Sequence, residues 1–319
     1  MTPETDRLRH GQWQCPSDLP YARSHAPVVA WQGKLYVFGG GGPAFQSLNQ
    51  VAIYNPETNA WRSGLDMPTK RSGTVAYLRD GKIWVLAGGY KKPDGYFQFL
   101  RTAEIYDPAT DQWVAGPSLQ EPHDYPAAAI TVDETLLVCG GHHPAATLGG
   151  PRTDPGFTMS EALAPHSTAW TRLPDLQVPR FAAAGFVYDN RVYVAGGVAH
   201  RAGEFNNFDV IEVLDLKRPQ RWNYAPWRLP WPAAGHALCV HRNHLFMFGG
   251  YSTESIHARA AICDLRNGVW HALPEMPYPR AAMGVAVLGD TLYLVGGWAD
   301  DGRTPVASVI AYRCPELVA

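Results

Sequence analysis

Short stretches in which apolar and polar residues alternate, each followed by a tight turn, fill nearly the whole chain. Residues 74–78 (TVAYL) alternate with a period of two, and a turn at residues 79–81 leads from them into the apolar run 82–86. Two such runs joined by a short turn are typical of a β-hairpin. The 3.6-residue periodicity of an amphipathic helix is found nowhere in the chain, so the pattern predicts an all-β protein.

An apolar run that ends in two consecutive glycines occurs six times. The first glycines of these pairs are 47 to 56 residues apart, and a tryptophan precedes each pair by 26 or 27 positions. The pairs are Gly39-Gly40, Gly88-Gly89, Gly140-Gly141, Gly196-Gly197, Gly249-Gly250 and Gly296-Gly297, and the tryptophans are Trp13, Trp61, Trp113, Trp170, Trp222 and Trp270. The nearly constant second spacing indicates that one half of each repeat is rigid and that the other half carries the length variation.

Each repeat contains four short strands. In the second repeat the hairpin is followed by a variable loop, by the run AEIYDP at 103–108, and by a last strand that begins at Trp113. Four antiparallel strands in a repeat of about 50 residues are typical of a β-propeller blade. The chain is therefore predicted to be a six-bladed β-propeller, one domain over residues 1–319, with blades at about 20–67, 68–120, 121–175, 176–229, 230–276 and 277–314.

The two ends of the chain are predicted to share the sixth blade. The last repeat supplies three strands and ends before any tryptophan, whereas residues 11–16 contain Trp13 and precede the first complete repeat. The N-terminal strand would then complete the C-terminal blade and close the ring. Closure of this kind removes exposed sheet edges.

These features together resemble the kelch repeat family, and the resemblance covers essentially the whole chain. Besides the glycine pairs and the spaced tryptophans, the turn Tyr-Asp/Asn-Pro is present at Tyr54-Asn55-Pro56 and at Tyr106-Asp107-Pro108. The third, fourth and fifth repeats lack that turn. The resemblance implies a propeller that displays variable loops around the mouth of a central channel, where a ligand or a partner would bind.

Composition narrows the range of partners and locations. The chain has 27 basic and 29 acidic side chains, a formal net charge of −2 and no basic cluster, which argues against nucleic acid and against an anionic membrane surface as partners. The chain contains no run of 18 apolar residues, which is about the length needed to span a bilayer. Its first 15 residues are too polar for a signal peptide. Five cysteines without CxxC spacing predict a reducing, cytoplasmic location. The excess of Arg over Lys, 21 against 6, is typical of a GC-rich bacterial coding sequence.

Arginines recur just before the first strand of four blades, on the face that also carries the variable loops. They are Arg23, Arg71, Arg180 and Arg280. The resemblance to animal kelch adaptors implies that arginines at these positions hold acidic peptides, and guanidinium groups suit carboxylates and phosphates. With His25 and Trp298 they would form a ligand-binding pocket for a small anionic or polar molecule or an acidic peptide. The alternative is that each arginine hydrogen-bonds the carbonyls of neighbouring loops.

Three histidines fall in alternate blades near the same mouth. His25, His123 and His236 would lie about 120° apart in a sixfold ring and could hold one divalent metal ion as neutral imidazoles, with Asp124, His142 or His143 nearby. The alternative is that they are hydrogen-bonded surface or channel residues. Counted from their glycine pairs, the three histidines are two or three residues out of register with one another. The sequence therefore leaves open whether the protein binds a metal cofactor.

Two functional hypotheses from different classes follow. The first is a binding propeller whose mouth holds an anionic or polar ligand. The second is a cytosolic enzyme on a small acidic substrate, with isomerase-, epimerase- or lyase-like chemistry, in which His123, Tyr125 and His236 act as acid–base groups. The longest variable loop, at 142–158, would decide how enclosed the mouth is.

Overall fold

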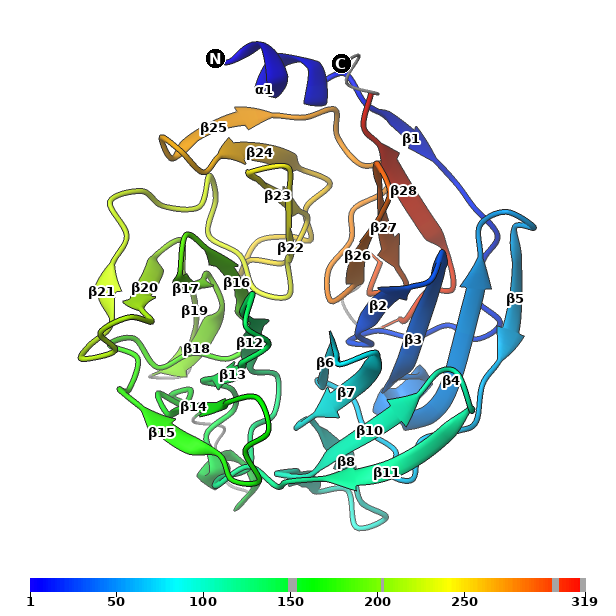
Figure 1. Cartoon of the computed structure of the whole chain (residues 1–319), viewed down its shortest axis with the longest axis vertical. Coiled ribbons are helices and arrows are strands. Elements are labelled where there is room, and N and C mark those ends of the chain that lie inside the picture. Colours follow the sequence, from blue (N-terminus) through cyan, green and yellow to red (C-terminus); the bar gives the residue numbers. More distant parts are fainter. Residues whose placement is uncertain (149–153, 202–203, 300–303, 316–319) are drawn as a thin grey trace.

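Six four-stranded antiparallel sheets surround a central channel in the computed structural model (Figure 1), as the sixfold repeat predicted. The structure describes residues 1–148, 154–201, 204–299 and 304–315. From the inner to the outer strand, blade 1 contains β2 (Val28–Trp31), β3 (Lys34–Gly41), β4 (Ser47–Asn55) and β5 (Ala60–Ser63), and blade 2 contains β6 (Val75–Arg79), β7 (Lys82–Leu86), β10 (Ala103–Asp107) and β11 (Gln112–Gly116). In the same order, blade 3 contains β12 (Ala127–Ile130), β13 (Leu136–Cys139), β14 (Ser160–Leu163) and β15 (Thr171–Leu173), and blade 4 contains β16 (Ala184–Tyr188), β17 (Arg191–Ala195), β20 (Ile211–Asp215) and β21 (Asn223–Tyr224). Blade 5 contains β22 (Ala237–His241), β23 (His244–Phe248), β24 (Ala260–Asp264) and β25 (Val269–Ala272).

The sixth blade is built from both ends of the chain, as predicted. Its strands are β26 (Gly284–Leu288), β27 (Thr291–Val295), β28 (Val309–Arg313) and, as the outer strand, β1 (Gln12–Gln14). β1 pairs antiparallel with β28, so that Trp13 lies opposite Tyr312. The first and last strands of the protein are therefore joined by backbone hydrogen bonds, and the ring is closed.

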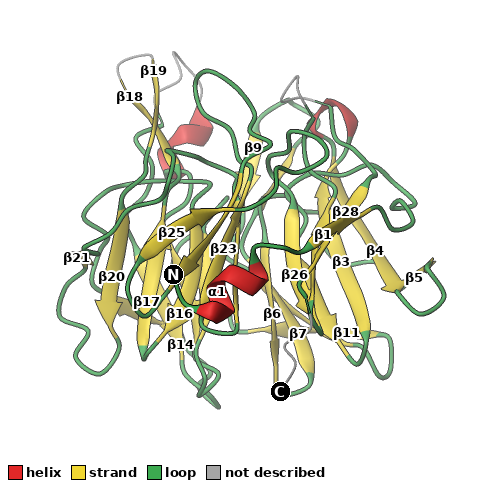
Figure 2. Ribbon diagram, turned by 90° about the horizontal axis from the view of Figure 1, so that it is seen from above, coloured by secondary structure: helices red, strands yellow, loops and turns green. Residues whose placement is uncertain are grey.

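The loops are concentrated on one face of the ring, which we call the loop face, and the tight turns on the other, the turn face (Figure 2). The loop face carries two extra hairpins, β8 (Gly89–Lys91) with β9 (Phe97–Phe99) and β18 (Val198–Arg201) with β19 (Glu204–Asn207). Two short 3₁₀ helices, η1 (Pro43–Phe45) and η2 (Pro144–Leu148), belong to loops that follow glycine pairs. Within the described residues, no helix is long and apolar enough to cross a membrane.

The core consists of apolar clusters between neighbouring blades, one at each of the six blade interfaces. The repeated tryptophans fasten these interfaces, because each indole N–H donates to a backbone carbonyl of an adjacent blade or of the segment leading into one. The bonds are Trp13 to Pro274, Trp61 to Ser17, Trp113 to Leu65, Trp170 to Pro117, Trp222 to Pro174 and Trp270 to Arg228, at 2.8–3.1 Å. The constant spacing from tryptophan to glycine pair therefore reflects the packing of one blade on the next.

The glycine pair of the second repeat is shifted by one residue from its sequence position. In the other five blades the first glycine has φ of 51–67° and the second has φ of 89–116°. In blade 2 these two places are taken by Ala87 (φ 60°) and Gly88 (φ 83°), and Gly89 begins the next strand. The first place lies in the left-handed region that an alanine tolerates, whereas the second lies beyond it and favours glycine.

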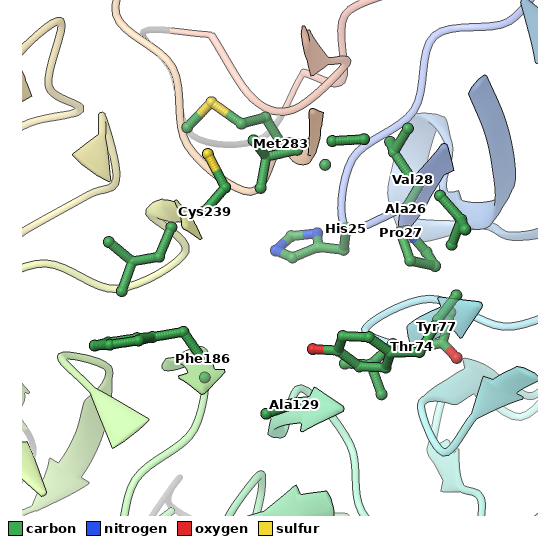
Figure 3. Close-up of a pocket in the computed structure, with 18 of the residues that line it drawn as sticks. His25, Ala26, Pro27, Val28, Thr74, Tyr77, Ala129, Phe186, Cys239 and Met283 are labelled. Atoms are coloured by element: carbon green, nitrogen blue, oxygen red, sulfur yellow. The ribbon is translucent and has the colours of Figure 1, made fainter. Parts of the chain in front are cut away.

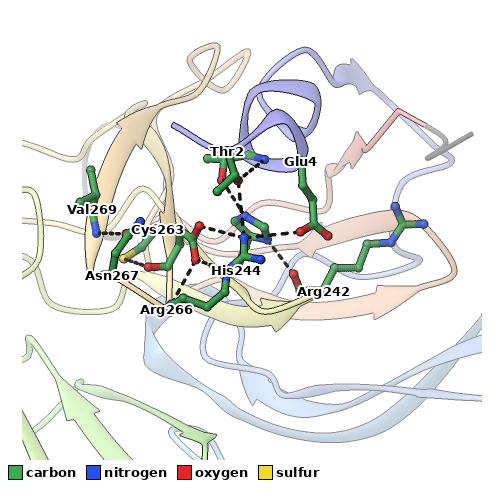
Figure 4. Close-up of polar contacts among 10 residues, drawn as sticks. Thr2, Glu4, Arg242, His244, Cys263, Arg266, Asn267 and Val269 are labelled. Atoms are coloured by element: carbon green, nitrogen blue, oxygen red, sulfur yellow. Dashed lines mark hydrogen bonds and ion pairs between the residues drawn. The ribbon is translucent and has the colours of Figure 1, made fainter. Parts of the chain in front are cut away.

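An N-terminal helix that the sequence analysis did not predict covers the outside of blades 5 and 6. Helix α1 (Pro3–Leu8) is a single amphipathic turn and a half, too short for its periodicity to stand out. Leu8 is fully buried in the cluster between these blades, and Tyr312 Oη donates to the Leu8 carbonyl at 2.9 Å. Thr5 Oγ1 lies 2.9 Å from His244 Nε2, and Arg266 reaches Glu4 (Figure 4). The helix thus extends the ring closure beyond β1.

Candidate functional site

One residue with left-handed backbone stands at the loop-face end of every inner strand, and together these six residues form what we call the mouth ring. The mouth ring consists of His25, Gly73, Tyr125, Ala182, Gly235 and Ala282, with φ of 52–60°. The N–H groups of five of them donate to the carbonyl of the ring residue in the neighbouring blade, at 2.6–3.0 Å: His25, Tyr125, Ala182, Gly235 and Ala282. These bonds make a rigid backbone frame around the loop-face end of the channel.

Two members of the mouth ring carry large side chains, whereas the other four are glycine or alanine. The rings of His25 and Tyr125 meet edge to face with centroids 4.5 Å apart. They meet across Gly73, where an added Cβ would lie 2.4 Å from the Tyr125 ring. Figure 3 shows the His25 ring projecting from its strand toward the channel axis. A left-handed backbone is costly for a bulky residue, and such strain is concentrated at functional sites.

Ring contacts continue from this pair into blades 6 and 4. Trp298 meets His25 edge to face at 4.4 Å, and His142 meets Tyr125 at 5.2 Å. His142 in turn stacks on Phe181 with centroids 3.9 Å apart. We call these five residues the aromatic arc. These five side chains pack on one another through ring edges and ring faces.

A carboxylate fixes the orientation of His142 within the arc. Its Nδ1 is hydrogen-bonded to Asp154 Oδ2, and the other oxygen of Asp154 accepts from the N–H groups of His143 and Gly156, both at 3.1 Å. Burial alone would raise the pKa of Asp154, but the hydrogen bond and charge of His142 and the two backbone donors bring it below its usual value. A histidine held by a carboxylate is an arrangement that supports proton transfer.

Asp124 places a second, unusual carboxyl group behind the arc. Its side chain is buried, and Oδ1 has no hydrogen-bond partner among the described residues. Burial raises the pKa of Asp124 to about 7, with the nearby charge of His142 opposing and that of Asp154 adding to the effect. Burial also lowers the pKa of His25 to about 3, helped by the charge of His142, so this imidazole is neutral.

The carboxyl of Asp124 is expected to titrate near pH 7 and to make stability depend on pH. The folded-state pKa of about 7 exceeds the unfolded value of about 3.9. Burial of the carboxyl therefore does not lower the free energy of unfolding through ionisation below about pH 4, but lowers it progressively as the pH rises to about 7. An Asp124→Asn variant should therefore match the native protein at low pH and be more stable at about pH 8. Urea denaturation at both pH values measures this, with the exposed Asp175 changed to Asn as control. Equal pH dependence of Asp124→Asn and native protein would contradict the assignment.

The four arginines do not face the mouth, contrary to the expected pocket lining. Each is buried in its blade, and its Nη1 donates to the carbonyl of the first residue of the left-handed pair. The bonds are Arg23 to Gly39, Arg71 to Ala87, Arg180 to Gly196 and Arg280 to Gly296, at 2.7–3.0 Å. The left-handed pair turns the chain out of the sheet ladder, so that this carbonyl needs another donor. The arrangement is the alternative weighed above, in which arginines bind loop carbonyls.

In the two blades without such an arginine, another side chain hydrogen-bonds the carbonyl of the first residue of the left-handed pair. In blade 3 His123 occupies the arginine position, with Nδ1 2.6 Å from the Gly140 carbonyl and Nε2 3.1 Å from the buried Glu161. In blade 5 the position is taken by Ala233, and the indole of Trp231 donates to the Gly249 carbonyl at 3.2 Å. His123 is thus engaged inside its blade and does not reach the mouth as the proposed acid–base role requires.

The three histidines expected to share a metal are not brought together. His25 belongs to the mouth ring, His123 lies inside blade 3, and His236 is buried between blades 4 and 5, where a Cβ on Gly196 would meet its ring at 2.6 Å. Burial lowers the pKa of His236 to about 4. Among the described residues, no group of three or more His, Cys, Asp or Glu side chains could hold a metal ion. Of the sequence-predicted site residues, the structure unites His25, Tyr125 and Trp298.

Comparison with known families agrees with this architecture. Residues 2–197 match the family model described as the KLHDC2/KLHL20/DRC7 Kelch-repeats domain, and residues 279–316 match the Kelch motif. The chain belongs to the kelch-repeat family. The kelch propeller fold supports a role in binding a ligand or a protein.

Similar proteins differ in length from this kelch chain. It is 26% identical to the Kelch-like protein terF of Aspergillus terreus, covering 93% of this chain and 66% of that protein. It is 24% identical to human Kelch-like protein 23, covering 89% of this chain and 47% of that protein. The chain thus spans about half to two thirds of these curated relatives. The solved structure named "Structure of YjhT" has the same fold, with a TM-score of 0.76, 14% identity and coverage of 93% of this chain and 96% of that one.

Proposed function

We propose that this kelch propeller binds a small polar ligand at the mouth ring, in contact with His25, Tyr125 and Trp298. The observation that carries the proposal is the pair of bulky side chains held on left-handed backbone, where the other blades have glycine or alanine. Strain of this kind costs of order 1–3 kcal/mol per residue, persists where the surrounding structure enforces it, and is often found at functional sites. Both residues belong to the mouth ring, and the contact between their rings supports a shared site.

The surroundings favour a neutral, flat or cyclic ligand over an anion. The buried arginines spend Nη1 on backbone carbonyls, and the ionisable groups at the arc are the paired His142 and Asp154 and the buried carboxyl of Asp124. An anion would find the His142 imidazole already engaged by Asp154 and the Asp124 carboxyl close by, whereas the neutral His25 and the ring edges offer hydrogen bonds and stacking. The anionic small molecule or acidic peptide expected from the sequence therefore becomes the competing ligand class for the test.

A second candidate function is acid–base catalysis on such a ligand, favoured by the His142–Asp154 pair. His142 is oriented by Asp154 and by stacking on Phe181, and Tyr125 lies beside it at 5.2 Å. In this version of the enzyme hypothesis His142 takes the role that the sequence assigned to His123 or His236. Conversion of a bound cyclic substrate between isomers, followed by NMR, would separate catalysis from binding.

The binding proposal is tested by titrating neutral and anionic small molecules into the protein and its variants. Monosaccharides and small phenols are expected to bind, and sugar acids or an acidic peptide to bind more weakly. Tyr125→Gly, which installs the residue of blade 2, should abolish binding while changing the free energy of unfolding little, because relieved strain offsets lost ring contacts.

The matched control is Tyr21→Ala, which removes an exposed tyrosine from the same face. Its affinity for the same ligands should equal that of the native protein. Binding that survives Tyr125→Gly, or tight binding confined to anions, would refute the assignment of the mouth ring as a site for neutral polar ligands.

A further inference from the structure

A second pocket, separate from the mouth ring, lies on the outer part of blade 5, between the strands β24 and β25 and the segment that leads into the blade (Figure 1). Its volume is about 230 Å³, whereas sites for drug-sized ligands usually have about 300–1,000 Å³. The residues that contribute apolar side chains to its wall include Trp231, Ala260, Ala261, Trp270 and Leu273. The pocket therefore suits a small molecule with an apolar part.

Blade 5 lacks a buried pair of polar side chains that fills the corresponding place in three other blades. In blades 2, 3 and 4 the third strand carries a glutamate opposite the second strand, two residues before the left-handed pair, whereas in blade 5 this position is Ala261. The pairs are Arg71 with Glu104, His123 with Glu161 and Arg180 with Glu212. Blades 1 and 6 have no glutamate there but keep the arginine. Blade 5, with Ala233 at the arginine position, lacks both, and Ala261 lines the pocket.

The missing glutamate also leaves backbone groups without the partners that they have in other blades. In blade 4, Glu212 accepts from the N–H groups of Gln177 and Val178 at 2.7 and 3.0 Å, and the Gln177 side-chain amide donates to the carbonyl of the repeated tryptophan at 2.6 Å. Blade 3 has the same three bonds. The corresponding residues of blade 5 are Pro230, which has neither an N–H nor an amide, and Trp231, whose N–H has no acceptor among the described residues. Blade 5 therefore lacks both a carboxylate for this N–H and a side-chain donor for the tryptophan carbonyl.

Two charged side chains of opposite sign border the same pocket. Arg259, just before β24, and Glu275, after β25, line the pocket and are exposed. Neither side chain has a hydrogen bond or an ion pair among the described residues. His271 is the third titratable residue of the wall, and burial, helped by the charges of Arg9 and the N-terminus, lowers its pKa, so that it is neutral near pH 7. One positive and one negative group are thus available to a ligand.

We propose that this pocket of blade 5 binds a free α-amino acid with an apolar side chain of about the size of leucine. The carboxylate of the ligand accepts from the Trp231 N–H and pairs with Arg259, in place of the glutamate of other blades. Its ammonium group donates to the Trp270 carbonyl and pairs with Glu275, in place of the glutamine amide. The apolar side chain packs on the two tryptophans. The proposal does not rest on the function proposed for the mouth ring.

The first test is a ligand-observed NMR titration of the intact protein with L-leucine, leucinamide and 4-methylpentanoate. Leucinamide lacks the carboxylate and 4-methylpentanoate lacks the ammonium group. Each should bind at least about tenfold more weakly than leucine, because a hydrogen bond to a charged group is lost. Glycine should also bind at least about tenfold more weakly, because it has no apolar side chain to bury. No saturable binding of leucine, or equal affinity for leucine and its two analogues, would overturn the proposal.

The second test assigns each charged end of the ligand to its residue. Arg259→Gln should weaken leucine binding about fivefold, the upper range for an exposed ion pair, and leave the affinity for leucinamide unchanged. Glu275→Gln should weaken leucine and leucinamide to a similar extent and leave 4-methylpentanoate unchanged. The matched controls Arg218→Gln and Glu57→Gln change exposed residues of blades 4 and 1 and should bind leucine like the native protein. Native leucine affinity in both pocket variants would place amino-acid binding elsewhere and refute the assignment.

The third test fills the pocket with a side chain of the protein. Ala261→Glu restores the glutamate of blades 2 to 4, whose carboxylate takes the place of the ligand carboxylate at the Trp231 N–H, so leucine binding should be lost. Ala115→Glu makes the same change on the exposed outer strand of blade 2 and should leave the affinity unaltered. Native leucine affinity in a folded Ala261→Glu protein would overturn the proposal. If this variant does not fold, the exposed variants at Arg259 and Glu275 decide.

Discussion

Replacing Arg180 by Ala is expected to lower the free energy of unfolding by about 3–5 kcal/mol. Arg180 Nη2 lies 2.7 Å from Glu212 Oε1, and both side chains are completely buried. The replacement would leave the Glu212 carboxylate in the blade without its counter-charge. It would also remove the donor to the Gly196 and Val210 carbonyls, and a buried acceptor without a partner is costly.

Urea denaturation measures the effect, and Arg172→Ala is the matched control. Arg172 pairs with Asp175 at 2.9 Å on the surface, with both side chains about half exposed, so its loss should cost less than about 1 kcal/mol. If Arg180→Ala kept native stability but lost affinity for an anion, the arginine would be a ligand-binding residue and its structural role would be refuted. The variant Glu212→Gln keeps the hydrogen-bonding capacity of the side chain but removes its negative charge. It therefore tests the contribution of the carboxylate separately from that of the arginine.

The architecture could be predicted from the sequence because every blade must solve the same two problems. The chain must turn sharply after the second strand, which requires glycine at the second left-handed position. Each outer strand must also be fastened to its neighbour, and the tryptophan indoles do so at every interface. A requirement that recurs six times leaves a periodic signal, and only the offset at Ala87 and Gly88 departs from it.

The positions of the four arginines could be predicted from the sequence, but the groups that their side chains contact could not. Their recurrence was compatible both with a ring of anion ligands and with bonds to loop carbonyls. The spacing contained a clue, because Arg23, Arg71, Arg180 and Arg280 each precede the carbonyl that they bind by 16 residues, within the rigid half of the repeat. A residue at fixed distance from a structural motif is more easily explained by that motif than by a ligand.

The candidate site was the least predictable part because it breaks the symmetry of the ring. His25, Tyr125 and Trp298 could be named from their places in the repeat, but not their mutual contacts, which depend on the glycine at position 73. Asp154 was missed altogether. It lies in the longest loop, and its bond to His142 depends on how that loop folds, for which no repeat provides a template. Residues 149–153 of the same loop lie outside the described part of the chain.

Replacing Leu8 by Ala is expected to lower the free energy of unfolding by about 2–5 kcal/mol, although Leu8 lies outside every strand. Its side chain is fully buried against blades 5 and 6, and its carbonyl accepts from Tyr312 Oη of the last strand. The change leaves a cavity where α1 supports the joint between the chain ends. Because β1 is only three residues long, we infer that ring closure depends on this helix as well as on strand pairing.

Thermal and urea denaturation check this expectation, with Leu65→Ala as the matched control. Leu65 is nearly half exposed, so the same truncation there should cost less than about 1 kcal/mol. A Leu8→Ala protein as stable as the Leu65→Ala protein would show that β1 alone secures the sixth blade. A loss within the expected range would instead make α1 part of the closure, because Leu8 shares its buried cluster with Phe248 and Tyr312 of the two blades that the helix joins.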